Sequence, residues 1–182
     1  MLYLPKQSAR GDGGGARRHN RRMPHRRSAR AEETPAGHLA EARLQSVLGY
    51  QLAQAAIVTG SVFDAQAGTP FGLRPVEYTV LTLIAENPGG SLARIARALA
   101  VTAPSITVMV DRLEARGLVQ REQSAEDRRT QVLHTTPQGT DLVRKSTERI
   151  IEGERAVLPL TPGERAMLLE LLHKVACARP AR

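Results

Sequence analysis

The chain of 182 residues contains no tryptophan, one cysteine and few aromatic side chains, which make up 3% of its residues. The single Cys177 excludes a disulfide bond within the chain and suits a reducing compartment. No apolar run approaches the ~18 residues that a membrane-spanning helix needs, and residues 1–4 are too short for the apolar part of a signal peptide. We therefore expect a cytoplasmic protein that does not bind a membrane.

Motifs for catalysis and for metal binding are missing as well. The five histidines, at positions 19, 25, 38, 134 and 173, show no metal-ligand spacing with Asp, Glu or Cys. No motif that joins a serine nucleophile to a histidine and an acid is evident. We therefore expect no enzyme activity, no metal and no cofactor. His134 falls in a predicted strand, where a structural role is the simpler interpretation.

Positive charge is concentrated at the start of the chain. The formal net charge is +8, and residues 1–38 hold nine Lys or Arg against three Asp or Glu, so +6 lies there and +2 in the remainder. The segment 1–37 combines three consecutive glycines, arginine pairs and few apolar residues, a composition typical of disorder. A basic tail of this kind can add salt-sensitive, sequence-independent affinity for DNA phosphates. The alternative is a misassigned start codon, with the true beginning nearer Met23 or later.

Residues 91–136 predict a helix-turn-helix unit followed by a basic β-hairpin. A short helix is expected over 91–99 and a second helix over 102–117. Two strand-like runs, 118–123 and 130–136, then flank a polar tip that carries arginines. A helix sized for a DNA groove beside an arginine-bearing loop is typical of proteins that read duplex DNA.

The second of these helices has one apolar face and one face of small groups. At about 100° per residue, Ile106, Met109, Val110 and Leu113 form the stripe expected in the core. Thr102 is the expected N-cap, and small residues at the helix start let its backbone amides approach a phosphate. On the outer face a threonine can read a base edge and a valine can pack on a thymine methyl. The DNA-contacting residues predicted in the two helices are Ser91, Thr102, Ala103, Pro104, Ser105, Thr107, Val108 and Arg112.

The tip of the hairpin carries an Asp-Arg-Arg triplet. One of its arginines can enter a minor groove, attracted by the negative potential there, while Asp127 holds the guanidinium in position. On its own, such a triplet is more often a solvated turn with exposed ion pairs that contribute little. Its position after two helices favours the DNA-binding interpretation, so we predict DNA contacts from Asp127, Arg128 and Arg129.

Long amphipathic segments flank this unit. Residues 38–70 are predicted as one helix that is ended by Gly68-Thr69-Pro70. Thr136 and Thr161, each followed by proline, start two further helices within residues 137–179. A small core cannot cover all the apolar stripes of these helices, so we predict that they are buried in a twofold homodimer. The alternative is that the stripes pack within one chain.

Several segments match one pattern in order: LRPVEYTVL at 73–81, IA at 95–96, DRLEARGLV at 111–119, EDRR at 126–129 and TPQG at 136–139. In this combination the chain resembles the MarR family of bacterial winged-helix transcription regulators. The resemblance implies a mainly α fold with a small β-hairpin (α+β), a winged helix-turn-helix with N- and C-terminal dimerisation helices. It also implies a homodimer that binds double-stranded DNA at a palindromic operator.

The resemblance places the wing pair of the family on Asp127 and Arg129. Two departures from the pattern are notable. Ala103 and Val108 stand where many relatives carry polar or basic groups, so base reading here is expected to use few hydrogen bonds. Thr135 stands where leucine is usual, which is expected to alter only the packing under the wing.

Together these observations predict four parts: a disordered basic tail over 1–37, a dimerisation helix over 38–70, the winged helix-turn-helix over 71–136 and C-terminal dimerisation helices over 137–179. The predicted function is that of a dimeric, sequence-specific transcriptional regulator, a repressor. The alternative is a winged-helix module that docks a protein partner without reading DNA.

The resemblance further implies that a small aromatic or phenolic effector releases the DNA by binding between the dimerisation helices and the winged domain. By analogy, Tyr50, Phe63, Arg74 and Tyr78 would border this site. Aromatic rings would stack with such a ligand, and the arginine can meet a carboxylate. The alternative is that the three aromatic residues belong to the core, because a chain with so few aromatics needs them for packing.

Overall fold

The structure is a computed structural model that describes residues 33–124 and 131–179, so the predicted basic tail falls almost entirely outside the described residues. The chain forms two compact units, one up to Ser46 and one from Val47. The described part of the first unit, residues 33–46, contains turns and one isolated β-bridge between Glu33 and Ala40.

The helix predicted from residue 38 is wrong over residues 38–47, because helix α1 begins only at Leu48. The preceding turn satisfies its hydrogen bonds locally: the Thr34 hydroxyl donates to the carbonyl of Ala36 (2.6 Å) and accepts the N–H of Leu39 (3.0 Å). His38 has a φ of 51°, in the left-handed region that a helix cannot use. Side-chain hydrogen bonds of this kind compete with helix formation.

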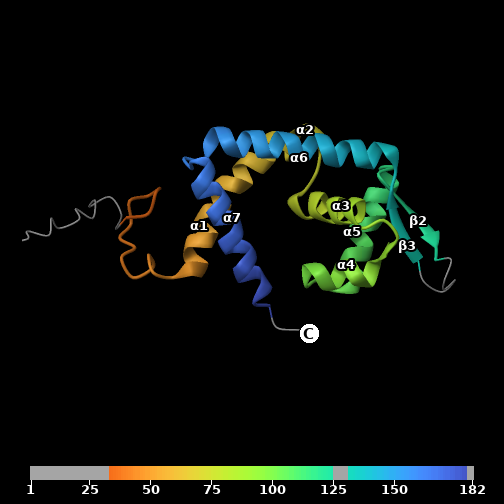
Figure 1. The fold of residues 1–182 in the computed structure, drawn as a ribbon, viewed down its shortest axis with the longest axis horizontal. Helices are drawn as coiled ribbons and strands as arrows, with labels where there is room; N and C mark the ends of the chain where they lie inside the picture. The colour runs from red at the N-terminus through yellow and green to blue at the C-terminus, as the bar shows by residue number, and fades with distance from the viewer. Residues whose placement is uncertain (1–32, 125–130, 180–182) are drawn as a thin grey trace, which may run out of the picture. The chain divides into compact units, whose positions relative to one another are not determined.

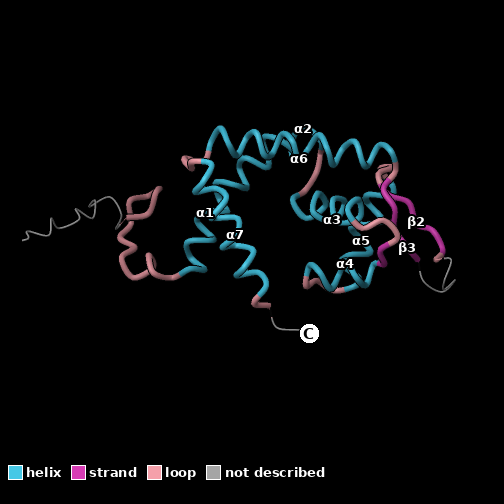
Figure 2. Tube along the Cα trace, in the orientation of Figure 1, coloured by secondary structure: helices cyan, strands magenta, loops and turns pink. Residues whose placement is uncertain are grey.

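The second unit consists mainly of helices, with one small sheet (Figures 1 and 2). Its three antiparallel strands are ordered β1-β3-β2. The elements in chain order are α1 (Leu48–Phe63), the π-helix η2 (Asp64–Gly68), α2 (Thr69–Phe71), α3 (Pro75–Glu86), β1 (Gly90–Ser91), α4 (Leu92–Leu99), α5 (Ala103–Ala115), β2 (Val119–Gln123), β3 (Gln131–Thr135), α6 (Pro137–Val157) and α7 (Pro162–Cys177). The predicted α+β class with a winged helix-turn-helix is confirmed.

The first long helix does not end at the predicted Gly68-Thr69-Pro70. It widens into the π-turn η2, where the N–H of Thr69 donates to the carbonyl of Asp64 five residues earlier, and it continues through α2. Pro70 is the second residue of α2, directly after the π-turn. The helix ends at Gly72, whose φ of 60° suits glycine.

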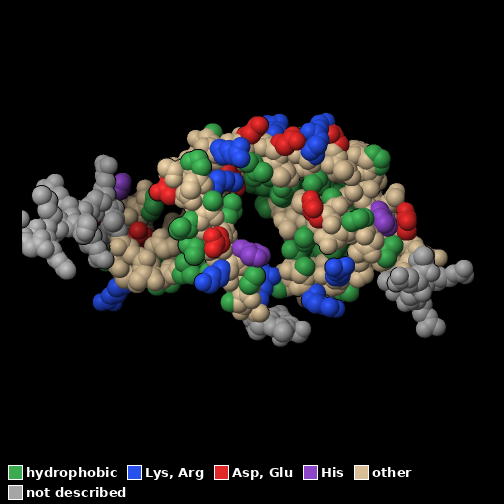
Figure 3. All heavy atoms as spheres, in the orientation of Figure 1, with side chains coloured by type: hydrophobic (Ala, Val, Ile, Leu, Met, Phe, Trp, Pro, Cys, Tyr) green, Lys and Arg blue, Asp and Glu red, His purple; other side chains and the backbone are tan. Residues whose placement is uncertain are grey.

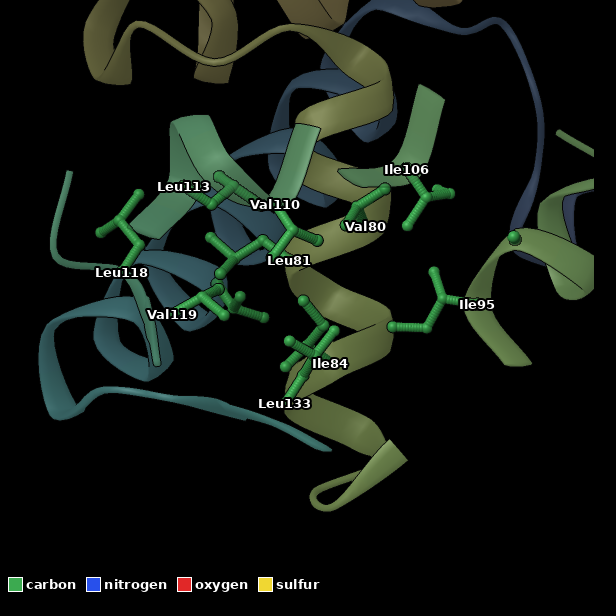
Figure 4. Packing of buried hydrophobic residues seen from close by; sticks show 12 residues of the cluster. Val80, Leu81, Ile84, Ile95, Ile106, Val110, Leu113, Leu118, Val119 and Leu133 are labelled. Atoms are coloured by element: carbon green, nitrogen blue, oxygen red, sulfur yellow. The ribbon is translucent and has the colours of Figure 1, made fainter. Parts of the chain in front are cut away.

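The main core gathers around α3 and α5 (Figure 4). The predicted stripe of α5 is confirmed for Ile106, Val110 and Leu113, which are fully buried, whereas Met109 is only partly buried. Each fully buried aliphatic side chain contributes roughly 1.5–3 kcal/mol by leaving water. The other fully or almost fully buried members come from α3, from the turn after α5 and from the sheet: Val80, Leu81, Ile84, Leu118, Val119 and Leu133.

The predicted hairpin is confirmed as β2 and β3, which pair from Val119↔Thr135 to Gln123↔Gln131. The structure adds a strand that the sequence did not indicate. The two residues of β1 pair with β3 on its other side, with Gly90 opposite Leu133 and Ser91 opposite Val132. This short pairing ties the start of α4 to the wing.

Helix α6 starts tightly against the turn that follows α5. Its N-cap Thr136 accepts the N–H of Gly139 (3.1 Å) and donates its hydroxyl proton to the carbonyl of Gly117 (2.7 Å). A Cβ at Gly139 would overlap the carbonyl oxygen of Leu118 and lie 2.9 Å from its carbonyl carbon, so the close approach requires glycine. The predicted start of this helix is confirmed.

The outer helices leave most of their apolar side chains exposed. In α1 only Val62 and Phe63 are buried, and in α7 no residue is. The predicted capping box of α7 is present: Glu164 donates its N–H to the Thr161 hydroxyl, and its carboxylate accepts the N–H of Thr161. The exposed apolar residues of α7 are Met167, Leu168, Leu169, Leu171, Leu172 and Val175.

Within the described ranges, no single helix has the length and apolarity to cross a membrane, although α4 and α5 taken together, bent by 114°, meet the criteria of length and composition.

Candidate nucleic-acid interface and effector site

Helices α4 and α5 are joined by a turn that sets them 114° apart. Ala100 adopts the left-handed conformation (φ 54°), and the next N–H, that of Val101, donates to the carbonyl of Ala96 (3.1 Å). This is the pattern that closes a helix end sharply. Ser91 caps α4 by accepting the N–H of Arg94 (3.4 Å), so this predicted DNA contact also has a structural role.

The start of α5 presents small polar groups to solvent. Thr102 occupies the N-cap position, as predicted, but its hydroxyl shares a hydrogen bond with the hydroxyl of Ser105 (2.8 Å) instead of capping a backbone N–H. The first backbone amides of the helix therefore keep their capacity to bind an anion. Thr102, Ala103, Pro104 and Ser105 are all exposed.

The outward face of α5 is also accessible. Thr107, Val108 and Asp111 are exposed, and the exposed fraction of Val108 is 50%. The hydroxyl of Thr107 donates to the carbonyl of Ala103 at 3.0 Å. Of the predicted contacts on α5, all lie on its exposed surface.

An ion-pair clamp fixes the wing to α5. The guanidinium of Arg121, in β2, donates to the carboxylates of Asp111 and Glu114, the latter at 2.6 Å. The Arg121 side chain is only 19% exposed, and its Nε is buried without a described hydrogen-bond partner. We did not predict this clamp from the sequence. Carboxylates three residues apart on a helix that precedes a strand with a basic residue were the available signal.

The predicted wing contacts Asp127, Arg128 and Arg129 fall outside the described residues, which stop at Ser124 and resume at Gln131. The strands that precede and follow them are described, and Figure 1 shows β2 and β3 at the same end of the molecule as α5.

Two arginines in the last turn of α5 and directly after it bind residues of the preceding segment, from the end of α2 to the start of α3. Arg116 donates to the carbonyls of Phe71 (2.8 Å) and Gly72 (2.9 Å). One turn earlier, Arg112 pairs with the buried Glu77 at 3.7 Å. Arg112, a predicted DNA contact, therefore has a partner within the protein although its side chain is 52% exposed. These links join residues far apart in sequence, so no local sequence pattern could predict them.

Two of the four predicted effector-site residues meet in a small second cluster. The rings of Phe63 and Tyr78 lie 5.8 Å apart between centroids, tilted by 55°. The Tyr78 hydroxyl shares a hydrogen bond with Thr147 of α6 (2.8 Å). Tyr50 lies thirteen residues before Phe63 in the same helix, so the 1.5 Å rise per residue separates them by about 20 Å along the axis.

The remaining predicted residue, Arg74, is exposed at the start of α3, where its backbone N–H donates to the carboxylate of Glu77 (3.0 Å). The same cluster includes Ala67, Leu73 and, partly buried, Phe71. Phe71 also carries the guanidinium of Arg149 over its ring, 5.5 Å from the centroid. The cluster thus combines aromatic rings with the guanidinium of Arg149.

Cavities on the described surface include a larger and a smaller one. The larger, of about 520 Å³, lies where α6 meets α7 and is bordered by the ion pair of Glu154 and Arg165 (2.7 Å). The smaller, of about 60 Å³, lies between α3 and α4. Neither is lined by the four predicted effector residues. Over the described residues, no group of three or more His, Cys, Asp or Glu side chains is arranged to hold a metal ion.

Comparisons with known proteins give consistent matches. A sequence profile of the MarR family matches residues 73–130. A protein of Thauera aromatica described as a transcriptional regulatory protein for the hcr operon is 33% identical over 129 residues, which cover 70% of this chain and 78% of the relative. The transcriptional repressor NicR of Pseudomonas putida is 30% identical over 116 residues, 63% of this chain and 73% of the repressor.

Among solved structures, the transcriptional repressor CouR bound to a 23-mer DNA duplex is similar with a TM-score of 0.69 and 31% identity, over 76% of this chain and 98% of that one. The family and these relatives are transcriptional regulators and not enzymes. With its helix-turn-helix, its wing and these matches, the chain belongs to the MarR family of DNA-binding transcriptional regulators.

Proposed function

We propose that the protein is a dimeric repressor that binds a palindromic operator and is released by a small aromatic molecule. The observation that carries the proposal is the exposed helix α5, held beside the wing by the clamp of Arg121 on Asp111 and Glu114. The repressors NicR and CouR support the direction of regulation, since both are similar to this chain. Its place of action is the cytoplasm, where bacterial DNA lies.

The DNA contacts divide by chemistry. Thr102, Ser105 and the free amides at the start of α5 suit a phosphate, because donors at a helix N-terminus favour anions. Thr107 and Val108 are assigned to the base edges, because both are exposed on the outer face of α5. Asp127 and Arg129 are assigned to the minor groove by the sequence pattern, with Arg128 beside them. Arg112 is assigned to the DNA backbone, with Glu77 orienting it from the protein side.

The binding claim is tested by fluorescence anisotropy with the DNA upstream of the protein's own gene. Arg129→Ala is expected to weaken binding by about 1–3 kcal/mol if this arginine makes a specific contact. Arg144→Ala is the control, because Arg144 pairs with carboxylates of its own helix α6. Equal affinities for wild type and the Arg129 variant would remove the wing from the mechanism.

The dimer is proposed from the exposed apolar faces of α1 and α7. Helix α7 has no buried residue in the single chain, yet its leucines recur at helical spacing. Figure 3 shows hydrophobic side chains exposed on the surface over α1 and α7. A second copy that covers these faces would place two α5 helices in successive major grooves. In this proposal α1 and α7 serve dimerisation, and residues 71–136 bind DNA.

The oligomeric state is measured by analytical ultracentrifugation. Leu171→Glu is expected to yield monomers, because a charge in the centre of an apolar interface is costly. Val108→Glu provides a matched control: Val108 is 50% exposed and Leu171 52%, but Val108 lies on the DNA-facing side. A dimer that survives the Leu171 variant would place the interface elsewhere.

The effector site is proposed at the cluster of Phe63, Phe71 and Tyr78, where Arg149 lies over the Phe71 ring and the exposed Arg74 follows the buried Leu73 in the chain. Rings next to arginines suit a planar aromatic molecule with an anionic group. CouR has also been solved bound to p-coumaroyl-CoA, whose coumaroyl part is aromatic. A ligand that shifts Phe71 would pull on Arg116, because Arg116 holds the Phe71 carbonyl, and would so disturb the end of α5.

Titration of the preformed protein–DNA complex with p-coumaroyl-CoA and with free aromatic acids tests the effector claim. Release of DNA by any of them, weakened in a Tyr78→Ala variant that still binds DNA, is the expected result. A complex that all these compounds leave intact would contradict the aromatic effector.

The second candidate is a winged-helix module that docks a protein partner. Its supporting observation is the weak hydrogen-bonding capacity of the outer face of α5, where Val108 and Pro104 are exposed. A flat salt dependence, or equal binding to any duplex, would favour this module over the regulator.

A further inference from the structure

The first turns of α5 lack the side chains that most proteins use to read bases. Residues 102–110 contain no Arg, Lys, Asn or Gln. Arginine or lysine pairs with guanine, and asparagine or glutamine pairs with adenine, through bidentate hydrogen bonds in the major groove. The segment that would enter the groove therefore cannot make any of these pairs.

The hydroxyl groups of the segment are largely occupied within the protein. Thr107 uses its only hydroxyl proton for the carbonyl of Ala103 (3.0 Å). Thr102 and Ser105 are bonded to each other (2.8 Å) at the helix start, where a phosphate is the natural partner. Hydrogen-bond donation from Thr107 to a base edge would first have to break a bond that the structure already makes.

What the outer face does offer is apolar surface. Pro104, Thr107 and Val108 lie within about one turn of each other and are exposed. The next residue on this face, Asp111, is held by Arg121 and so is drawn toward the wing. Of all the base edges in the major groove, only thymine presents an apolar group, its C5-methyl.

We infer that α5 recognises its operator through thymine methyl groups, which pack on Val108 and on the γ-methyl of Thr107. This inference rests on the proposed function as a DNA-binding regulator and names the feature of the DNA that the helix reads. Burial of methyl groups, and not hydrogen bonding, then supplies the base discrimination in the major groove. The operator half-site carries thymines at the positions that face these two residues.

The test begins with the full-length protein and a pool of randomised duplexes, from which bound sequences are selected and their consensus determined. Each thymidine of the consensus is then replaced by deoxyuridine. This substitution removes the C5-methyl and leaves base pairing unchanged. Burial of one such group contributes about 0.8 kcal/mol, so replacement at a contacted position is expected to weaken binding about fourfold.

Two protein variants connect the methyl groups to the residues. In Val108→Ala the deoxyuridine penalty at one thymine is expected to disappear, because the partner surface is gone, whereas it persists at the others. Thr107→Ser removes the γ-methyl and keeps the hydroxyl, and it is expected to abolish the penalty at a neighbouring thymine. Thr79→Ser is the control, because Thr79 donates its hydroxyl to Pro75 in α3 in the same manner as Thr107 donates to Ala103.

The outcomes distinguish failure of the thymine-methyl inference from failure of the proposed function as a DNA-binding regulator. A consensus whose affinity is unchanged by deoxyuridine overturns the thymine-methyl inference and leaves the regulator intact. The same holds if both variants keep the full penalty at every thymine. A pool from which no sequence is enriched refutes specific DNA reading itself, and the inference falls with it.

Discussion

Replacing Arg121 by methionine is expected to loosen the wing from α5. The arginine holds the carboxylates of Asp111 and Glu114, and its side chain is only 19% exposed. A hydrogen bond to a charged group contributes about 1.5–3 kcal/mol in general. Because the two carboxylates are 52% and 38% exposed, solvent screening reduces this to about 1 kcal/mol for each pair.

Methionine fills similar volume, and it removes a buried Nε that lacks a described partner. The expected net loss in the free energy of unfolding is therefore about 2 kcal/mol. For a protein of this size, that corresponds to a fall in Tm of about 4–8 °C. Thermal unfolding followed by circular dichroism measures the shift, and urea unfolding gives the free energy directly.

Arg144→Met is the matched control. Arg144 also pairs with two carboxylates, Asp141 and Glu148, but all three lie on one exposed helix face and the arginine side chain is 57% exposed. Pairs of this spacing contribute about 0.2–0.5 kcal/mol each. Equal shifts for the two variants would refute the argument that burial and the link between wing and helix make the Arg121 clamp strong.

Three further changes have defined outcomes. Gly139→Ala is expected to cost about 3 kcal/mol in the free energy of unfolding, because the new Cβ would overlap the Leu118 carbonyl; urea unfolding with an unchanged midpoint would contradict it. Hydrogen bonds from the backbone and then the hydroxyl of Thr161 lower the pKa of Glu164 below its ordinary 4.5. The stability difference between wild type and Glu164→Gln should be complete above pH ~4.5 and should vanish as the pH falls through the lowered pKa of Glu164 in the folded protein. Thermal unfolding at a series of pH values measures this difference. Arg116→Gln should speed amide exchange in the turn after α2, and unchanged exchange would show that this arginine does not hold the turn.

The winged unit was predictable because its signals are local. The apolar stripe of α5 repeats at helical spacing, so Ile106, Val110 and Leu113 had to share a face and become the core. Thr136 and Thr161 each precede proline, a combination that is typical of a helix start. The hairpin followed from its two short strands.

The failures share a physical cause, because each depends on an interaction that the spacing of apolar residues does not show. Residues 38–47 have apolar spacing, but the hydroxyl of Thr34 and the left-handed His38 close a turn instead. Strand β1 has only two residues, and its pairing with β3 depends on a partner some forty positions away. Sequence spacing carries no record of such distant partners.

The candidate site was predictable only in part for the same reason. The exposed face of α5 follows from its core face, so the exposure of Thr107 and Val108 could be predicted. The internal hydrogen bond of Thr107 was not, although a threonine inside a helix often bonds four residues back. The links of Arg116 to Phe71 and Gly72 span 45 and 44 positions, beyond any local pattern.

Because of the π-turn η2, the orientation of the segment that follows depends on the exact number of residues between α1 and α3. Deleting one residue from 64–68 would restore four-residue hydrogen bonds, and the ring of Pro70 would then clash inside a regular helix. The same deletion would rotate everything that follows by about 100° and turn Phe71 out of its cluster. Homologues that lack this proline are therefore expected to align with a one-residue gap here, so evolutionary insertion at this point and the appearance of the proline should coincide.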